Sequence, residues 1–298
     1  MNSSPPKIAK PAQLGKGPAA ITTAPKILVF DSGVGGLSIV DAIRRRLPAC
    51  DFVFACDNAA FPYGTKEEAI LLHRVEIALH TLIAREQPDV VVIACNTAST
   101  LVLPHIRSRF TLPVVGVVPA IKPAAEQSQS RVIGLLGTPG TIARPYTDEL
   151  IEEFARDCDV VKVGSSELVI LAEAALRGSA PDNSTLKQII APFFLHPSLD
   201  TIVLACTHFP LLREALKGNA PRQVRWIDSG EAIARRVASL LGMEDNKLDA
   251  DYLEASNLKP GSFSSVFTSD ATQHSVESLR PALKAMACNE IHYVLIQD

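Results

Sequence analysis

Two cysteines of the chain stand in matching sequence contexts. Cys95 ends the apolar run VVIAC, Cys206 ends the apolar run IVLAC, and small polar residues follow both thiols at once. A buried, inert thiol is the ordinary reading of either cysteine, because free cysteine is among the most buried residue types. Two thiols that face one substrate carbon could instead remove a proton from one side and return a proton to the other, since a thiol pKa near 8.5 is easily tuned. We therefore predict that Cys95 and Cys206 are a catalytic pair.

Two further side chains are candidates to assist these thiols. His208 lies two positions after Cys206, and Asp31 ends the apolar run ILVFD. Each could hold or exchange a proton with a thiol. The alternatives are a helix-capping or surface histidine at position 208 and a helix N-cap at Asp31. We also expect a helix to open after each cysteine, and its N-terminal amides would lower the thiol pKa.

Two loops and a pair of threonines complete the candidate site. The glycine-rich loop DSGVGG (31–36) matches neither common nucleotide-binding pattern, and we interpret it as a site for a carboxylate. The loop DNAAFPYG (57–64) could present backbone amides and the Tyr63 hydroxyl to the same crevice, although a plain turn is the alternative. Thr138 and Thr141 are possible additional hydroxyl donors.

A parallel α/β arrangement would bring these segments together. Short apolar runs alternate with amphipathic stretches such as 66–87 and 145–157. Strands that are apolar on both faces are typical of parallel sheets covered by helices, and such sheets bind ligands at the carboxyl ends of their strands. The predicted strands are 27–30, 52–55, 90–94, 114–118, 132–136, 160–163 and 202–205.

Composition excludes several classes of protein. The chain has 298 residues, 47% hydrophobic and 20% charged, with a net charge of -3, so we expect two domains, no nucleic-acid partner and no membrane span. Residues 1–25 hold many prolines and lysines without an acid and are predicted to be a disordered tail rather than a targeting signal.

The six cysteines form no C-x-x-C pair, which argues against disulfides and structural zinc and for a cytoplasmic protein. His73, Glu76 and His80 have metal-compatible spacing, but we interpret them as an ordinary helix face, so no metal site is predicted.

Four motifs together resemble a known family. VFDSGVGGLSIV, DNAAFPYG, VVIACNTAST and IVLACTHFPLL, in this order, are similar to the glutamate racemases of the aspartate/glutamate racemase superfamily, over about residues 26–240. The resemblance implies two similar doubly wound parallel-sheet lobes with the active site between them. It also implies cofactor-independent interconversion of L- and D-glutamate by two cysteines, which supplies D-glutamate for peptidoglycan. The substrate contacts that it implies are Asp31, Ser32, Tyr63, Gly64, Asn96, Thr97, Thr207 and His208, with Cys95 and Cys206 as the thiols.

The resemblance also implies an interleaved domain layout. One lobe would comprise residues 26–120 plus 228–298, and the other residues 121–227. The segment GSSELV (164–169) and the N-terminal tail resemble the proteobacterial branch. In that branch UDP-N-acetylmuramoyl-L-alanine typically activates the enzyme, so we expect this activator as a partner. The sequence leaves open whether the protein is a monomer or a homodimer.

Three alternatives stay open or are disfavoured on the residues alone. A sister racemase that acts on aspartate or a hydantoin would use the same thiols. A two-lobed dicarboxylate-binding protein would need the crevice but not the thiols. A redox enzyme or a cysteine hydrolase is disfavoured, because the two cysteines lie far apart in sequence and no separate His/Asn pair stands out.

Overall fold

The larger of two sheets holds six parallel strands. The computed structural model describes residues 24–244, 260–269 and 274–296, so the predicted tail lies outside the described residues except for its last two positions. The strand order of this large sheet is β10-β9-β2-β1-β3-β4, and every described neighbour pair is parallel. Its strands are β1 (Lys26–Asp31), β2 (Asp51–Cys56), β3 (Val90–Ile93), β4 (Val114–Gly116), β9 (Phe263–Phe267) and β10 (Glu290–Tyr293).

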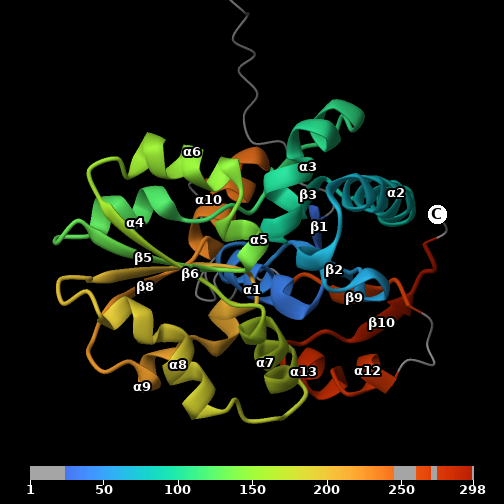
Figure 1. The fold of residues 1–298 in the computed structure, drawn as a ribbon. Helices are drawn as coiled ribbons and strands as arrows, with labels where there is room; N and C mark the ends of the chain where they lie inside the picture. Colours follow the sequence, from blue (N-terminus) through green and yellow to red (C-terminus); the bar gives the residue numbers. More distant parts are fainter. Residues whose placement is uncertain (1–23, 245–259, 270–273, 297–298) are drawn as a thin grey trace, which may run out of the picture.

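The small sheet holds four parallel strands in the order β6-β5-β7-β8. If the strands of this sheet are renumbered from its own first strand, the order is 2-1-3-4, which is also the order of β2-β1-β3-β4 in the large sheet. The two sheets lie on opposite sides of the molecule (Figure 1). The strands of the small sheet are β5 (Val132–Gly137), β6 (Asp159–Gly164), β7 (Thr201–Ala205) and β8 (Arg225–Ile227).

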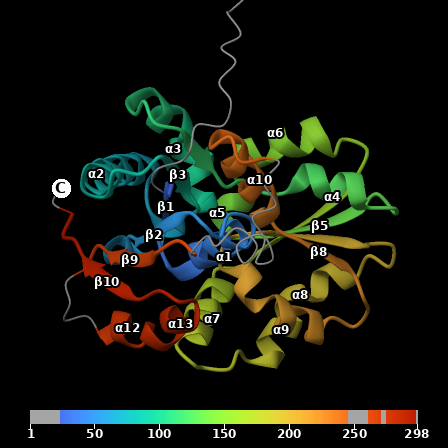
Figure 2. The same ribbon diagram turned by 180° about the vertical axis from the view of Figure 1, so that it is seen from behind.

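Helices cover both faces of both sheets. On the large sheet, α1, α10, α12 and α13 pack against one face and α2 and α3 against the other. On the small sheet, α7, α8 and α9 cover one face and α4 and α6 the other, as both views of the ribbon show (Figures 1 and 2). The helices are α1 (Leu37–Arg46), α2 (Glu68–Glu86), α3 (Asn96–Arg109), α4 (Ile121–Gln127), α5 (Pro139–Ile142), α6 (Pro145–Phe154), α7 (Glu167–Leu176), α8 (Asn183–Phe194), α9 (Arg213–Asn219), α10 (Gly230–Leu240), α12 (His274–Glu277) and α13 (Arg280–Ala285). Short 3-10 turns join them: η1 (Val34–Gly36), η2 (Asn58–Ala60), η3 (Tyr63–Thr65) and η4 (Phe209–Leu212).

The alternation of side chains in the central strands explains these layers. In β1, Ile27 and Val29 point into the core beneath α1 and α10, whereas Leu28 and Phe30 point into the core beneath α2 and α3. All four side chains are fully buried, so the strand has no solvent face. The predicted α/β class with parallel sheets is confirmed. Sequence reasoning missed β8, β9 and β10, which are short or carry polar residues.

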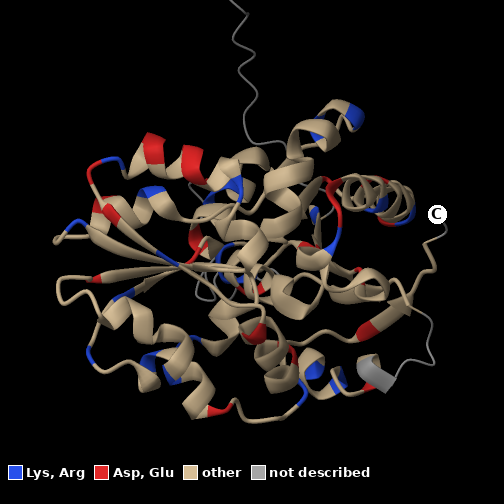
Figure 3. Cartoon of the chain, viewed as in Figure 1, with Lys and Arg blue, Asp and Glu red and all other residues tan. Residues whose placement is uncertain are grey.

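The large sheet takes its strands from residues 26–116 and 263–293, and the small sheet takes its strands from residues 132–227. The division into lobes at 26–120 plus 228–298 and 121–227 stays a prediction. Within the described residues, no helix is long and apolar enough to cross a membrane. Charged residues of both signs are interspersed over the outer helices (Figure 3).

Candidate active site

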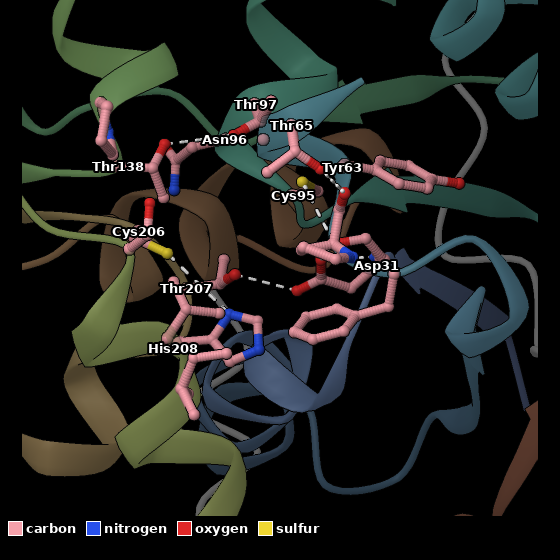
Figure 4. Close-up of a pocket in the computed structure, with 18 residues that line it drawn as sticks. Asp31, Tyr63, Thr65, Cys95, Asn96, Thr97, Thr138, Cys206, Thr207 and His208 are labelled. Carbon is pink, nitrogen blue, oxygen red and sulfur yellow. Dashed lines mark hydrogen bonds between the residues drawn. The ribbon is translucent and has the colours of Figure 1, made fainter.

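The carboxyl ends of β1, β3 and β7 meet at one cavity between the two sheets. The cavity has a volume of about 80 Å³, and all predicted catalytic and substrate-binding residues line it, whereas the candidate hydroxyl donor Thr141 does not. Figure 4 shows Cys95 and Cys206 on different elements, with their sulfurs directed toward the same space. The predicted lining residues are Asp31, Ser32, Tyr63, Gly64, Cys95, Asn96, Thr97, Cys206, Thr207 and His208. Those that were not predicted as site residues are Phe61, Pro62, Thr65, Pro139, Ser166, Val169 and Ile170, and Thr138 also lines the cavity.

Cys95 is a buried thiol that lies near the Asp31 carboxylate. It directly precedes α3 and is its N-cap residue, and its Sγ lies 3.7 Å from the Ser32 hydroxyl. Burial raises the pKa of this thiol, and the Asp31 carboxylate raises it further. Hydrogen bonds from the Ala98 amide and Ser32 oppose these effects without overcoming them. The Ala98 amide therefore acts in the predicted direction, but the net pKa of Cys95 is raised because desolvation outweighs it.

Cys206 has a different neighbour. Its Sγ lies 3.9 Å from Nδ1 of His208, and the turn that follows it is η4 rather than an α-helix. On the far side of the ring, Nε2 of His208 lies 2.8 Å from Oε1 of Glu173. Burial by itself would lower the pKa of His208, but the hydrogen bonds with Cys206 and Glu173 raise it to about 10. His208 is therefore an imidazolium at neutral pH, and its positive charge lies next to the Cys206 sulfur.

Glu173 is a residue of this site that sequence reasoning missed. It lies on α7, and its carboxylate also accepts hydrogen bonds from the Val34 backbone amide at 2.8 Å and from Arg177 Nη1 at 2.6 Å. Burial raises its pKa, but His208, Val34 and Arg177 lower it to about 2, so Glu173 is ionised. The only trace in the sequence is the i, i+4 spacing of Glu173 and Arg177, which indicates a helical ion pair and not a contact with His208.

The glycine-rich loop has a different role from the one predicted. A Cβ at Gly33 would lie 2.6 Å from Glu173 Oε1, and a Cβ at Gly35 would lie 2.5 Å from His208 Nδ1. The loop amide of Val34 donates to Glu173, so the carboxylate that this loop binds belongs to the protein itself. Glycine is required here because the small-sheet side of the molecule approaches the loop backbone closely.

Asp31 connects the two sheets. It is fully buried and accepts hydrogen bonds from Thr207 Oγ1 at 2.9 Å and from the Ser32 amide at 2.6 Å. Burial raises its pKa, although His208 and Thr207 act in the opposite direction. The N-cap alternative is wrong, because the N-cap residues of η1 and α1 are Gly33 and Gly36. The surface alternative for His208 is also wrong, since only 3% of that residue is exposed.

The Tyr63 hydroxyl does not reach into the cavity. It donates to Asp57 Oδ2 at 2.6 Å, and Figure 4 shows it directed away from the thiols. Arg74 holds the same carboxylate through Nε at 3.0 Å and Nη2 at 2.8 Å. The predicted hydroxyl contact is therefore corrected: Asp57 and Arg74 anchor the ring, and the 63–64 segment lines the cavity without its phenol oxygen.

Two polar side chains at the start of α3 complete the lining. Asn96 Oδ1 is buried and has no hydrogen-bond partner in the described structure, so an acceptor is left for a ligand. Thr97 Oγ1 lies 3.4 Å from Thr138 Oγ1, which in turn lies 3.0 Å from Thr141 Oγ1. Thr138 lines the cavity, whereas Thr141 contacts it only through Thr138.

Within the described ranges, no group of three or more histidine, cysteine, aspartate or glutamate side chains is arranged to hold a metal ion. Glu76 contacts His105 Nε2 at 2.7 Å and Arg109 Nε at 3.1 Å. The helix that carries His73, Glu76 and His80 therefore directs its carboxylate to neighbours on α3.

A parallel α/β fold with two thiols at equivalent strand ends, each with its own neighbour that can hold a proton, defines a class of acid/base enzymes that act on a small acid. The chain belongs to the Asp/Glu/hydantoin racemase family, whose model matches residues 28–237. It is 53% identical over 230 residues to a glutamate racemase of Pectobacterium carotovorum, covering 77% of this chain and 81% of that protein.

Solved structures agree with this family. The E. coli glutamate racemase, in complex with L-glutamate and the activator UDP-MurNAc-Ala, is 42% identical with a TM-score of 0.83, covering 92% of this chain and all of that one. A glutamate racemase isoform of Bacillus anthracis is 26% identical with a TM-score of 0.75, covering 93% of this chain and 98% of that one.

Proposed function

We propose that the protein is a glutamate racemase that interconverts L- and D-glutamate with its own two thiols instead of a cofactor. The observation that carries this proposal is the lining of one cavity by Cys95 and Cys206, which come from equivalent strands of two separate sheets. Two groups on opposite sides of a bound carbon are what inversion of that carbon requires. The family and its glutamate racemase relatives support the choice of substrate.

The two thiols have different neighbours. The cation at His208 lies beside Cys206, while burial and the Asp31 carboxylate raise the pKa of Cys95. In one direction, Cys206 takes the α-proton as the C–H bond breaks, and Cys95 gives its proton to the opposite face of the carbanion. In the other direction the roles of the two thiols reverse. Asp31 is connected to Cys95 through the Ser32 hydroxyl, which lies 3.3 Å from Asp31 Oδ1.

The lining groups suit the charges of glutamate. The unpartnered Asn96 Oδ1 can accept a hydrogen bond from the substrate ammonium. The side chains of Asn96 and Thr97, together with the first amides of α3, can stabilise the α-carboxylate as negative charge develops next to it. The amides of the 63–64 segment would hold the side-chain carboxylate.

Single substitutions of the thiols test the proposal. We expect Cys95→Ser and Cys206→Ser each to lower kcat/KM roughly 100-fold or more with either enantiomer, because each removes a group that transfers a proton. Cys158→Ser, at a half-buried cysteine outside the cavity, is the matched control and should behave like the wild type. Near wild-type racemisation by either active-site variant would refute the two-thiol scheme. Faster turnover of aspartate than of glutamate would refute the assignment of glutamate as the substrate.

The setting follows from the same proposal. We infer that the protein works in the reducing cytoplasm, since all six cysteines are free and the two catalytic thiols must stay reduced. Its product would supply D-glutamate for peptidoglycan. We extend to this chain the activation by UDP-MurNAc-Ala that the E. coli relative suggests. Racemisation assays with and without that compound test this point, and equal rates would contradict it.

A further inference from the structure

Arg144 links the two sheets beside the active site. It is the N-cap residue of α6, on the connection that follows β5 of the small sheet. Its Nη1 donates to the backbone oxygen of Thr97 at 2.7 Å and to Thr100 Oγ1 at 3.0 Å. Both acceptors belong to α3, which follows β3 of the large sheet. The Arg144 side chain is only 14% exposed, so solvent does little to screen these contacts.

The contacts fall on the turn that carries two of the cavity residues. Asn96 and Thr97 line the cavity in the first turn of α3. Thr100 Oγ1 also donates to the backbone oxygen of Asn96 at 3.0 Å. Arg144 therefore fixes this turn at two points, through the Thr97 carbonyl and through the hydroxyl that bonds to the Asn96 carbonyl.

Arg144 is the last member of a row that faces α3. Thr138, Thr141 and Arg144 follow one another at intervals of three residues, and Thr138 approaches Thr97 at 3.4 Å. The hydroxyls of Thr138 and Thr141 lie 3.0 Å apart, so the first two members of the row are hydrogen-bonded to each other. The guanidinium also lies 3.9 Å from Glu68, but that carboxylate is 69% exposed and adds little.

Charge gives Arg144 a second relation to the substrate. No lysine or arginine is among the described residues that line the cavity, although the proposed substrate carries two carboxylates. The guanidinium lies directly behind the turn that would bind one of these carboxylates. A fixed positive charge there, at low exposure, favours an anion in the cavity without contacting it.

We propose that Arg144 is a positioning residue that fastens the substrate-binding turn of α3 to the small-sheet side of the molecule and holds the cavity closed. The identity of the substrate as glutamate rests on the proposed function, whereas the attachment of α3 by Arg144 does not. Loss of the guanidinium lowers the fraction of molecules in the binding-competent form, and KM rises by the inverse of that fraction. The thiols are untouched, so kcat changes much less.

The experiment compares Arg144→Gln with Arg156→Gln, an arginine that is 75% exposed and pairs with Glu152. We expect Arg144→Gln to raise KM about tenfold or more for both enantiomers while kcat stays within about threefold. Because the two enantiomers are equally stable, kcat/KM must fall equally in both directions. Arg156→Gln should match the wild type. An unchanged KM, or a loss confined to kcat, would overturn the proposal.

A second measurement needs no substrate. Iodoacetamide alkylation of Cys95 and Cys206, followed by mass spectrometry, reports how often the cavity opens. We expect faster alkylation in Arg144→Gln than in the wild type or Arg156→Gln, and equal rates would overturn the fastening even if glutamate proved to be the wrong substrate. If Arg144→Gln does not fold, Arg144→Lys carries both tests, because it keeps the charge and one hydrogen bond and should give a smaller rise in KM.

Discussion

At the scale of single residues, the two thiols differ through their neighbours. Cys206 lies beside an imidazolium that Glu173 holds by a 2.8 Å hydrogen bond, whereas Cys95 lies beside Ser32 and the buried Asp31. The sequence contexts of the two cysteines are nearly alike, and the sequence predicted both thiols for that reason. The asymmetry depends on Glu173, which a different element contributes, so sequence spacing could not reveal it.

Replacing Glu173 tests how far Cys206 depends on this hydrogen bond. We expect Glu173→Gln to lower the pKa of His208 from about 10 and to reduce kcat/KM at least roughly tenfold, because the charge that holds the imidazolium is lost. Glu167→Gln, an exposed glutamate on the same helix, is the control. NMR titration of the His208 ring gives the pKa directly. An unchanged titration in Glu173→Gln would contradict the role of Glu173.

The same pair predicts how stability depends on pH. The folded-state pKa of His208 is raised from 6.5 to about 10, so its contribution is complete below pH 6.5 and is lost as the pH rises through 10. The pKa of Glu173 is lowered from 4.5 to about 2, so its contribution is present above pH 4.5 and is lost as the pH falls through 2. The difference in melting temperature between the wild type and Glu173→Gln should therefore be largest between pH 4.5 and 6.5. A difference that grows toward pH 10 would contradict this sign.

At the scale of helices and strands, the sequence predicted best those features that depend on residues close together in the chain. The apolar runs that end in Ala94-Cys95 and Ala205-Cys206 lead out of β3 and β7, which are the third strands of two equivalent orders. The tripeptide Asp-Ser-Gly also occurs twice in the chain, at residues 31–33 and 228–230, but it stands at the carboxyl ends of β1 and β8, which are not equivalent strands. A match of three residues is too short to predict topology, whereas a buried strand together with the turn that follows it is long enough.

The close approach of elements at η1 gives a prediction at this scale. A Cβ at Gly35 would meet the His208 backbone nitrogen at 2.7 Å and Thr207 Oγ1 at 2.6 Å, so η1 and the turn after β7 would have to separate. We expect Gly35→Ala to fold but to lose activity roughly 100-fold or more, because displacement of a catalytic group by about 1 Å has costs of that size. Gly218→Ala, where a Cβ meets nothing within 4 Å, is the matched control. Full activity of Gly35→Ala would show that the two elements can separate without harm.

At the scale of the whole molecule, two sheets of equivalent strand order enclose one cavity. Hydrogen bonds between the two sides surround it: Thr207 to Asp31, Val34 to Glu173 and Arg144 to Thr97. Sequence reasoning predicted the two sheets and the thiols but not these contacts, because each contact joins residues that are distant in the chain. Each sheet contributes one thiol, so the account requires that the two faces of the substrate carbon exchange protons with different groups.

That requirement can be measured directly by racemisation of L-glutamate in D₂O, stopped at low conversion. We predict that the D-glutamate formed carries deuterium at Cα while the remaining L-glutamate keeps its proton, since the thiol that donates is not the thiol that accepted. Product D-glutamate that retains the original proton, or deuterium that enters the recovered L-glutamate as fast as product forms, would contradict it.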